Sequence, residues 1–378
     1  MMIEDRPYTG LFVLDAGQGV AGPCCGMLLA ATGAEVVKLE PPEGDWSRGL
    51  SVRKGPESVL HAAWNRGKQG LVLDLKDPAG RAAAQALAAR ADVLIESFRP
   101  GVAARLGLGP EDTGPDAICL SISGFGQTGP YAERPCTDAV AQAFGGLAAL
   151  NQGADGIPHK TGPFVTDVMT GFAAFAAVQT ALAARAQDRA AGRPPRRRVL
   201  DLSLLAGTAM LLASQIGEAA LLGHSPGVPN VPAGCYQGSD GLWLMVTLVR
   251  DPDFVTLCRV LGLPPLAEDA RFANFAARST HAAELVPMVR DAFAGQPRDH
   301  WIAALQAARM MTTPVNSPVD WLADPHVVAV GAAPASVQGA LGAVPFPAVP
   351  GQPQPRGAAP LLGEHTAEIL SRLAPVPG

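Results

Sequence analysis

Short apolar segments alternate with segments of helical periodicity through the first half of the chain. The apolar runs predict β-strands at residues 11–17, 35–40, 70–75, 92–98 and 116–123. Helices are predicted at 24–33, 78–91 and 164–185, and a strand leading into a further apolar helix at 196–217. Short strands separated by helices of ten or more residues predict a parallel, doubly wound α/β sheet.

The pattern changes near residue 224, where a Pro/Gly-rich linker occupies 224–232. A strand at 241–249 and amphipathic helices at 251–263, 280–295 and 298–310 predict a second, smaller α/β module. The chain is then rich in Pro, Gly and Val, and closes with a short predicted helix within 359–373. We therefore expect a large domain of residues 1–225, completed by 329–378, and a small domain of 226–328.

The segment 13–48 has the outline of a nucleotide-handling βαβ unit: an apolar strand, a turn of small residues, a helix and a second strand. It lacks the G-x-G-x-x-G spacing that a dinucleotide turn needs. The second strand runs into Pro-Pro-Glu-Gly-Asp and then a basic residue. This combination favours a nucleotide-bearing ligand other than NAD.

Composition narrows the class of protein. The 378 residues are 48% hydrophobic, enough for a large core, and the net charge of −5 provides no basic field for nucleic acid. The longest apolar runs are interrupted by acidic residues, which argues against a membrane span. The six cysteines show no metal-binding spacing, so we expect free thiols in a reducing cytosol, and no metal. The predicted location is cytoplasmic.

Several motifs follow one another in order over almost the whole chain. Near the start stand Ala21-Gly22-Pro23, Val37-Lys38-Leu39-Glu40-Pro41, and Gly44-Asp45 with Arg48. They are followed by Asn65-Arg66-Gly67-Lys68, Leu73-Asp74-Leu75-Lys76 and Glu96-Ser97-Phe98-Arg99-Pro100-Gly101. The last two occupy residues 123–130 and 359–365. Together they resemble the class III CoA-transferases, the CaiB/BaiF family of formyl-CoA and carnitine CoA-transferases.

The resemblance implies a Rossmann-like large domain, a smaller α/β domain and an interlaced homodimer of ring-like chains. It implies acyl-CoA and a carboxylic acid as substrates, with no tightly bound cofactor. By resemblance the CoA site is lined by Val20, Ala21, Leu73, Lys76, Ser97, Phe98, Arg99 and Arg105. Ser97 replaces the usual Asn of the family. The chemistry agrees, because CoA phosphates favour Lys and Arg near strand ends; the alternative is that these are solvated surface charges.

The catalytic candidate is Asp167, at the start of the long helix. Taken alone, an Asp there is most often a helix cap, but the resemblance makes it the nucleophile, matched with Gly171 four residues later. A carboxylate ionises near pH 4 and needs no general base, and the helix N-terminus should keep it charged. We expect Gly171, lacking Cβ, to leave room for a thioester beside it.

Two further residues are catalytic candidates. Asp138 could orient the nucleophile, bind the acceptor or cap its own helix. Gln18 could donate to the developing oxyanion, or simply be a turn residue.

The sequence thus predicts a CoA-transferase acting through an aspartyl anhydride and an aspartyl-CoA thioester. One alternative is an α-methylacyl-CoA racemase of the same family, which would need a His where this chain has Thr137. Another is a non-catalytic acyl-CoA-binding relative. The glycine-rich flap region at 230–241 is short, and residues 308–316 depart from the family pattern, so the acids exchanged stay open.

Overall fold

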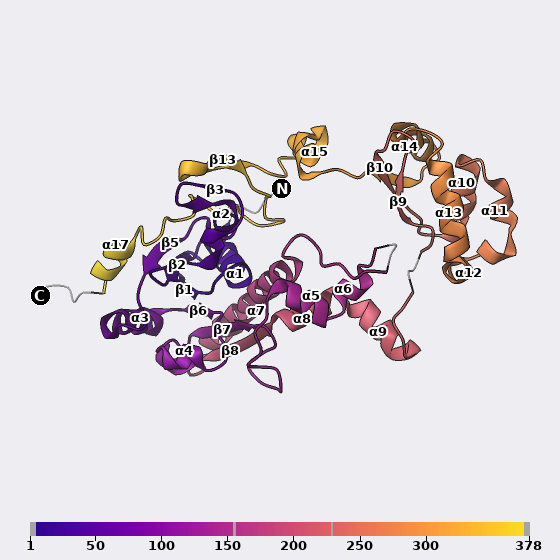
Figure 1. Ribbon diagram of the computed structural model, residues 1–378. Coiled ribbons are helices and arrows are strands. Elements are labelled where there is room, and N and C mark those ends of the chain that lie inside the picture. Colours follow the sequence, from indigo (N-terminus) through magenta and orange to yellow (C-terminus); the bar gives the residue numbers. More distant parts are fainter. Residues whose placement is uncertain (1–4, 154–155, 228–229, 374–378) are drawn as a thin grey trace, which may run out of the picture. The chain divides into compact units, whose positions relative to one another are not determined.

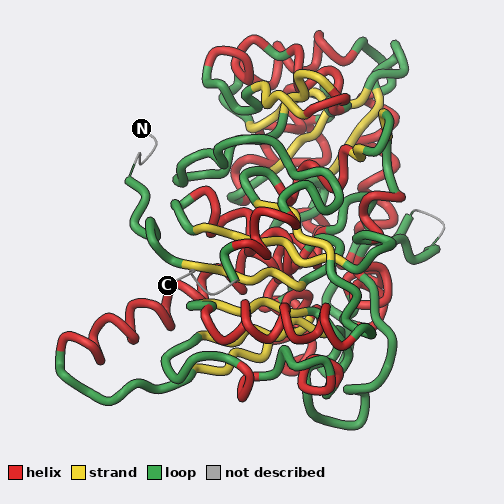
Figure 2. The backbone as a smooth tube through the Cα atoms, turned by 90° about the vertical axis from the view of Figure 1, so that its left-hand side faces the viewer, coloured by secondary structure: helices red, strands yellow, loops and turns green. Residues whose placement is uncertain are grey.

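The structure is a computed structural model that describes residues 5–153, 156–227 and 230–373. The chain divides into two compact units. The first comprises Met1–Ala213 with Gly331–Gly378, and the second Ser214–Val330. Figure 1 labels their elements, and Figure 2 distinguishes strands from helices by colour.

A six-stranded parallel sheet organises the first unit. Its strands are β1 (Phe12–Ala16), β2 (Glu35–Glu40), β5 (Gln69–Val72), β6 (Val93–Glu96), β7 (Ile118–Ser123) and β8 (Arg198–Ser203). They lie in the order β5-β2-β1-β6-β7-β8, and each neighbouring pair is parallel. The strand β1 lies in the middle, with β2 and then β5 on one side and β6, β7 and β8 on the other. This is the strand order of a dinucleotide-binding Rossmann sheet. The α/β fold class predicted from the sequence is confirmed.

Helices, hairpins and short turns complete this unit. The helices are α1 (Ala21–Ala31), α2 (Val59–Asn65), α3 (Pro78–Arg90), α4 (Val102–Arg105), α5 (Asp138–Phe144), α6 (Leu147–Leu150), α7 (Val165–Ala190), α8 (Leu204–Leu211) and α17 (Thr366–Ser371). Two small antiparallel hairpins are β3 (Arg53–Lys54) with β4 (Glu57–Ser58), and β12 (Ala335–Gln338) with β13 (Gly342–Pro345).

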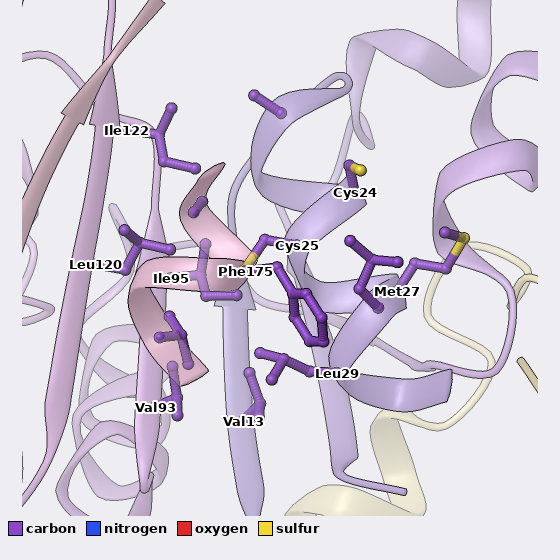
Figure 3. Close-up of a cluster of buried hydrophobic side chains, with 14 of the residues drawn as sticks. Val13, Cys24, Cys25, Met27, Leu29, Val93, Ile95, Leu120, Ile122 and Phe175 are labelled. Atoms are coloured by element: carbon purple, nitrogen blue, oxygen red, sulfur yellow. The ribbon is translucent and has the colours of Figure 1, made fainter. Parts of the chain in front are cut away.

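Both faces of the sheet are buried along most of the strands from β5 to β7, which explains why these strands read as continuous apolar runs, whereas the edge strand β8 alternates buried and exposed residues. Neighbouring residues point to opposite faces: Val13 packs in one core cluster and Leu14 in the other. The first cluster includes side chains of α1, α7 and the strands β1, β2, β6 and β7, and Figure 3 shows Phe175 of α7 among them. The second cluster lies against α3 and α17.

Helix α7 has the length and hydropathy of a membrane span, but its buried face packs in the core. Its apolar side chains Phe175, Val178 and Leu182 belong to the first core cluster. Core helices of water-soluble domains commonly share the length and hydropathy of membrane spans.

The C-terminal segment docks on the edge strand β5. The Gly70 N–H donates to His365 Nδ1 (3.1 Å), and the Val72 N–H donates to Thr366 Oγ1 (3.0 Å). The motif at 359–365 therefore closes the edge of the sheet and positions α17, whose Ile369 is buried in the second cluster.

The second unit has its own core around a three-stranded antiparallel sheet, in the order β11-β10-β9. The strands are β9 (Gly234–Gln237), β10 (Trp243–Thr247) and β11 (Met311–Pro314). Its helices are α9 (Ala213–Leu222), α10 (Asp251–Val260), α11 (Pro264–Glu268), α12 (Phe275–Thr280), α13 (Ala282–Phe293), α14 (Arg298–Ala307), α15 (Pro318–Ala323) and α16 (Pro325–Ala329).

Candidate active site

The candidate site lies where the strand order reverses, between β1 and β6. At such a point the turns after two neighbouring strands diverge and leave a crevice at their carboxyl ends. A cavity of about 190 Å³ opens there. It is lined by Gln18, Val20, Ala21, Gly22, Trp46, Ser97, Phe98, Arg99, Pro100, Ile122, Ser123, Gly124, Ala132, Cys136, Thr137, Asp138, Asp167 and Leu204.

Asp167 enters this cavity from the first turn of α7. It is 9% exposed, and the residue at the N-cap, Phe164, provides no side-chain cap. Burial, and then the charge of Asp138, raise the pKa of Asp167 to about 7. The helix N-terminus does not hold this carboxyl near its ordinary pKa, contrary to the expectation from sequence. The carboxyl is thus an unusually basic one at neutral pH.

The carboxylate of Asp138 caps α7 from another helix. Its Oδ2 accepts hydrogen bonds from the backbone N–H groups of Thr166 (2.8 Å) and Asp167 (3.0 Å). Its Oδ1 accepts from Gln142 Nε2 (2.5 Å), and Gln142 Oε1 in turn accepts from the Thr161 N–H (2.8 Å). Asp138 therefore fulfils the capping role that the sequence alone would assign to Asp167.

Gly171 faces α1 rather than the cavity. A Cβ at this position would lie 2.7 Å from Cys24 Cβ and 2.9 Å from the carbonyl oxygen of Ala21. The expected space for a thioester beside Gly171 is therefore a wrong prediction. The glycine instead allows α7 to approach α1 closely, which places the first turn of α7 at the cavity.

Two buried ion pairs lie beneath the turn that joins β1 to α1. Lys38 Nζ is 2.9 Å from Asp45 Oδ2, and Lys68 Nζ is 2.7 Å from Asp15 Oδ2; all four side chains are fully buried. Asp45, Asp15 and Glu40 raise the pKa of Lys38 even though burial opposes this, and Lys38 with nearby backbone N–H groups lowers the pKa of Asp45 despite burial. Both members of the first pair are thus charged at neutral pH.

A thiol also lines the cavity. Cys136 is half-buried, and its Sγ donates to the Thr137 carbonyl oxygen (3.5 Å). Burial, and then the charges of Asp167 and Asp138, raise its pKa to about 11. The thiol is therefore protonated under neutral conditions.

Comparison with known proteins decides the family. The sequence model of CoA-transferase family III matches residues 8–366. The chain belongs to this family. This membership confirms the family predicted from the motifs, and with it the prediction that the protein is a CoA-transferase.

Curated relatives match the transferase over nearly its whole length. It is 32% identical to the succinyl-CoA–D-citramalate CoA-transferase of Chloroflexus aurantiacus, over 97% of this chain and 94% of that protein. It is also 32% identical to the succinate–glutarate CoA-transferase of Agrobacterium fabrum, over 97% and 96% of the two chains. A solved CAIB/BAIF family protein from Brucella suis is 32% identical with a TM-score of 0.82, over 98% and 100% of the chains.

The cavity of the transferase brings together most of the residues singled out from its sequence. Those that line it are Gln18, Val20, Ala21, Ser97, Phe98, Arg99, Asp138 and Asp167. Three others lie outside the cavity lining: Leu73 is buried in the second core cluster, and Lys76 and Arg105 are exposed.

Several lining residues carry no role in the sequence-based hypothesis. Trp46 lies in the Gly-Asp-x-x-Arg motif between Asp45 and Arg48, so its position in the motif could have identified it as a cavity residue. Cys136 lines the wall because it directly precedes Thr137 and Asp138. Ile122 and Leu204 come from strand ends and a helix start, where the sequence pattern indicates only core packing.

Proposed function

We propose that the transferase moves CoA from an acyl-CoA to a free carboxylate through covalent intermediates on Asp167. The observation that supports this most directly is a carboxyl group in a cavity, with its pKa raised to about 7 by burial and by Asp138. A more basic carboxylate is a better nucleophile once ionised. An ordinary helix-capping Asp is exposed to solvent and does not have a raised pKa, whereas Asp167 is buried and has a raised pKa.

The proposed sequence begins when an Asp167 oxygen attacks the thioester carbonyl and the C–S bond breaks, giving a mixed anhydride and CoA thiolate. The thiolate then attacks the aspartyl carbonyl, which releases the first acid and leaves an aspartyl-CoA thioester. The acceptor carboxylate attacks this thioester and the CoA thiolate leaves. Finally the thiolate attacks the acceptor carbonyl of the new anhydride, giving the product thioester and free Asp167.

Anchoring of CoA is assigned to Lys76, Arg99 and Arg105. All three are exposed, and within the described residues none forms an ion pair or a side-chain hydrogen bond. Uncommitted cations remain available for the pyrophosphate and the 3′-phosphate of CoA. Arg99 lines the cavity itself, so we assign it the phosphate closest to the reacting thioester.

The acid substrates are proposed from the names of relatives. Those relatives are named for succinate, glutarate and citramalate, so short dicarboxylic acids are the first candidates here. The acids themselves are to be found with a panel of acyl-CoAs and acceptors.

The racemase alternative is disfavoured by Thr137, which lines the cavity beside Asp138. Racemisation at Cα needs a base on each face of the substrate, and a hydroxyl cannot accept a proton from carbon at neutral pH. Exchange of deuterium into the α-position of a 2-methylacyl-CoA at the turnover rate would favour the racemase instead.

A homodimer is part of the proposal. Apolar side chains are exposed on the outer strand β8 and on α8 of the first unit, where Val199 is 59% and Met210 63% exposed. In the second unit, Leu221 of α9 is 90% exposed. Exposed apolar residues of this kind are typical of surfaces that a second copy covers. Sedimentation at low micromolar concentration should show twice the 38.9 kDa mass of one chain; a folded monomer as the main species would contradict it.

The decisive experiment is mass spectrometry of the protein quenched during turnover with succinyl-CoA and glutarate. We expect an acyl or CoA mass on the peptide that contains Asp167. The matched control is Asp77, a true helix cap whose side chain accepts from the Gly80 N–H, and its peptide should carry no added mass. An adduct on Asp138, or the absence of any adduct during measured turnover, would contradict the proposal.

A further inference from the structure

The turn after β1 is held by side chains from other parts of the chain at three consecutive residues. Lys38 Nζ donates to the Gly17 carbonyl oxygen. The Gln18 N–H donates to Ser97 Oγ (2.9 Å). The Gly19 N–H donates to both carboxylate oxygens of Asp45, each at 3.0 Å. The backbone on both sides of Gln18 is therefore bound, and its own N–H as well.

The turn also leaves no room for a side chain at its glycines. Gly19 adopts a φ of +76°, and a Cβ there would lie 2.0 Å from Trp46 Cζ2. Gly17 is similarly tight, because its Cβ would lie 3.0 Å from the Gly22 Cα. A second ion pair supports the same turn: Asp15 Oδ1 accepts from the Gly17 N–H (3.0 Å), and Lys68 Nζ donates to the Pro23 carbonyl oxygen (2.9 Å).

We infer that Ser97, Lys38 and Asp45 are positioning residues that fix Gln18 at the wall of the cavity. The inference rests on the proposed function, and it takes up the role expected for Gln18 from the sequence, in which its side-chain amide donates to the oxyanion that forms on the reacting carbonyl. An oxyanion donor acts only if it is held in place before the reaction, because reorganisation would consume its contribution. None of the three residues has to touch the substrate for this role.

The charges of Lys38 and Asp45 support a role in positioning Gln18 over a role in stabilising the fold alone. A buried ion pair is often no more stabilising than apolar residues of similar volume, because both charges lose their hydration. Hydrogen bonds from charged groups to backbone atoms are, however, shorter and stronger than neutral ones. Lys38 and Asp45 use such bonds to hold the Gly17 carbonyl and the Gly19 N–H on either side of Gln18.

Ser97 offers the cleanest test, because it is a small residue outside the buried ion pairs. By resemblance it belongs to the CoA site, whereas its Oγ here accepts from Gln18. Ser97→Ala removes that acceptor, and Ser97→Thr keeps a hydroxyl. We expect Ser97→Ala to lower kcat by about 10- to 100-fold, with the Kd of CoA and the Tm little changed. Ser97→Thr should restore most of the activity.

A double-mutant cycle with Gln18 separates positioning from other roles. If Ser97 acts through the Gln18 side chain, Ser97→Ala should change kcat by less than about threefold in a Gln18→Ala background. The same non-additivity is expected for Asp45→Asn, provided that circular dichroism shows it folded. Hydrogen exchange of the backbone N–H of Gln18 should also be faster in Ser97→Ala, because this N–H loses its acceptor.

Two outcomes would overturn the inference. One is a loss of kcat from Ser97→Ala that is as large in the Gln18→Ala background as in the unaltered protein. The other is weaker CoA binding at unchanged kcat, which would make Ser97 a direct ligand of CoA. The adduct on Asp167 in the unaltered protein is measured in parallel. If the adduct is present and the effects of Ser97→Ala and Gln18→Ala on kcat are additive, only the positioning inference is refuted. If the adduct is absent during turnover, the proposed function is refuted.

Discussion

The turn after β1 and the start of α7 both border the cavity, yet they treat buried charge in opposite ways. Beneath the turn, the buried carboxylates of Asp45 and Asp15 have lysine partners, Lys38 and Lys68. At α7, Asp138 and Asp167 lie close to each other, and within the described residues neither forms an ion pair with a Lys or Arg. The paired charges hold backbone in place, whereas the unpaired carboxyl of Asp167 has a raised pKa. The turn after β1 is thus the region held by paired charges, and the start of α7 is the region with an unusually basic carboxyl.

The largest expected effect comes from removing the unpaired carboxylate. Asp167→Asn keeps the size of the side chain but cannot form an anhydride, so we expect CoA exchange to fall by more than the ~10²- to 10³-fold typical of one lost oxyanion donor. Turnover with succinyl-CoA and glutarate measures this. Asp77→Asn, at a capping Asp outside the cavity lining, serves as the control and should leave turnover near normal. Near-normal activity of Asp167→Asn would reduce Asp167 to a structural residue.

Breaking a buried ion pair should lower the stability of the fold, in addition to its effect on the position of Gln18. Lys38→Met leaves the fully buried Asp45 without its cation, so we expect the unit that contains it to lose about 3–5 kcal/mol in free energy of unfolding. Urea unfolding monitored by circular dichroism measures the change. Arg372→Met, which removes a surface cation paired with Glu35 and Glu368, is the control and should cost at most about 1 kcal/mol. Equal losses in both variants would contradict the comparison.

The unpaired carboxylate should itself destabilise the fold at neutral pH. Its pKa is about 7 when folded, above the ordinary Asp value, so ionisation is unfavourable only in the folded state. The penalty is absent below about pH 4, grows between pH 4 and 7, and is constant above that. Asp167→Asn should therefore raise the free energy of unfolding by roughly 2–4 kcal/mol at pH 8 and by little at pH 4. A pH-independent difference would show that the effect is not ionisation.

The smallest effect concerns the pH dependence of the reaction. Only the ionised carboxylate attacks, so the rate of adduct formation should rise with pH through about 7. The titratable groups that interact with Asp167 are Asp138 on α5, Cys24 on α1 and Cys136 before α5. Asp138→Asn removes one negative charge and should move the rise by about one unit toward lower pH. Stopped-flow measurement with one equivalent of acyl-CoA would reveal this shift, and a shift toward higher pH would contradict it.

The sequence predicts the sheet and most of the cavity lining because both depend on local pattern and motif order. It does not predict the pairing beneath the turn, although Lys38 and Asp45 both stand in motifs. Lys38 faces that turn because β2 pairs with β1 so that Lys38 lies beside Asp15, a register set by the whole sheet.

Two expectations about α7 fail for the same reason. The pKa of Asp167 and the neighbour of Gly171 depend on which helices pack around α7, and the pattern of one helix does not contain this. Asp138 lies 29 residues earlier in the chain, and its bond to the Asp167 N–H exists only after the helices assemble.

The thiol of Cys136 has a consequence for chemical selectivity. In the proposed mechanism, a thiolate beside the reacting thioester and anhydride would capture acyl groups and leave the enzyme blocked by its own substrate. With a pKa of about 11, roughly one Cys136 in ten thousand is ionised at pH 7, and it is the thiolate that reacts. Burial of Cys136, and then the charges of Asp167 and Asp138, thereby suppress its acylation, and the protein should survive long incubation with acyl-CoA without modification at this cysteine.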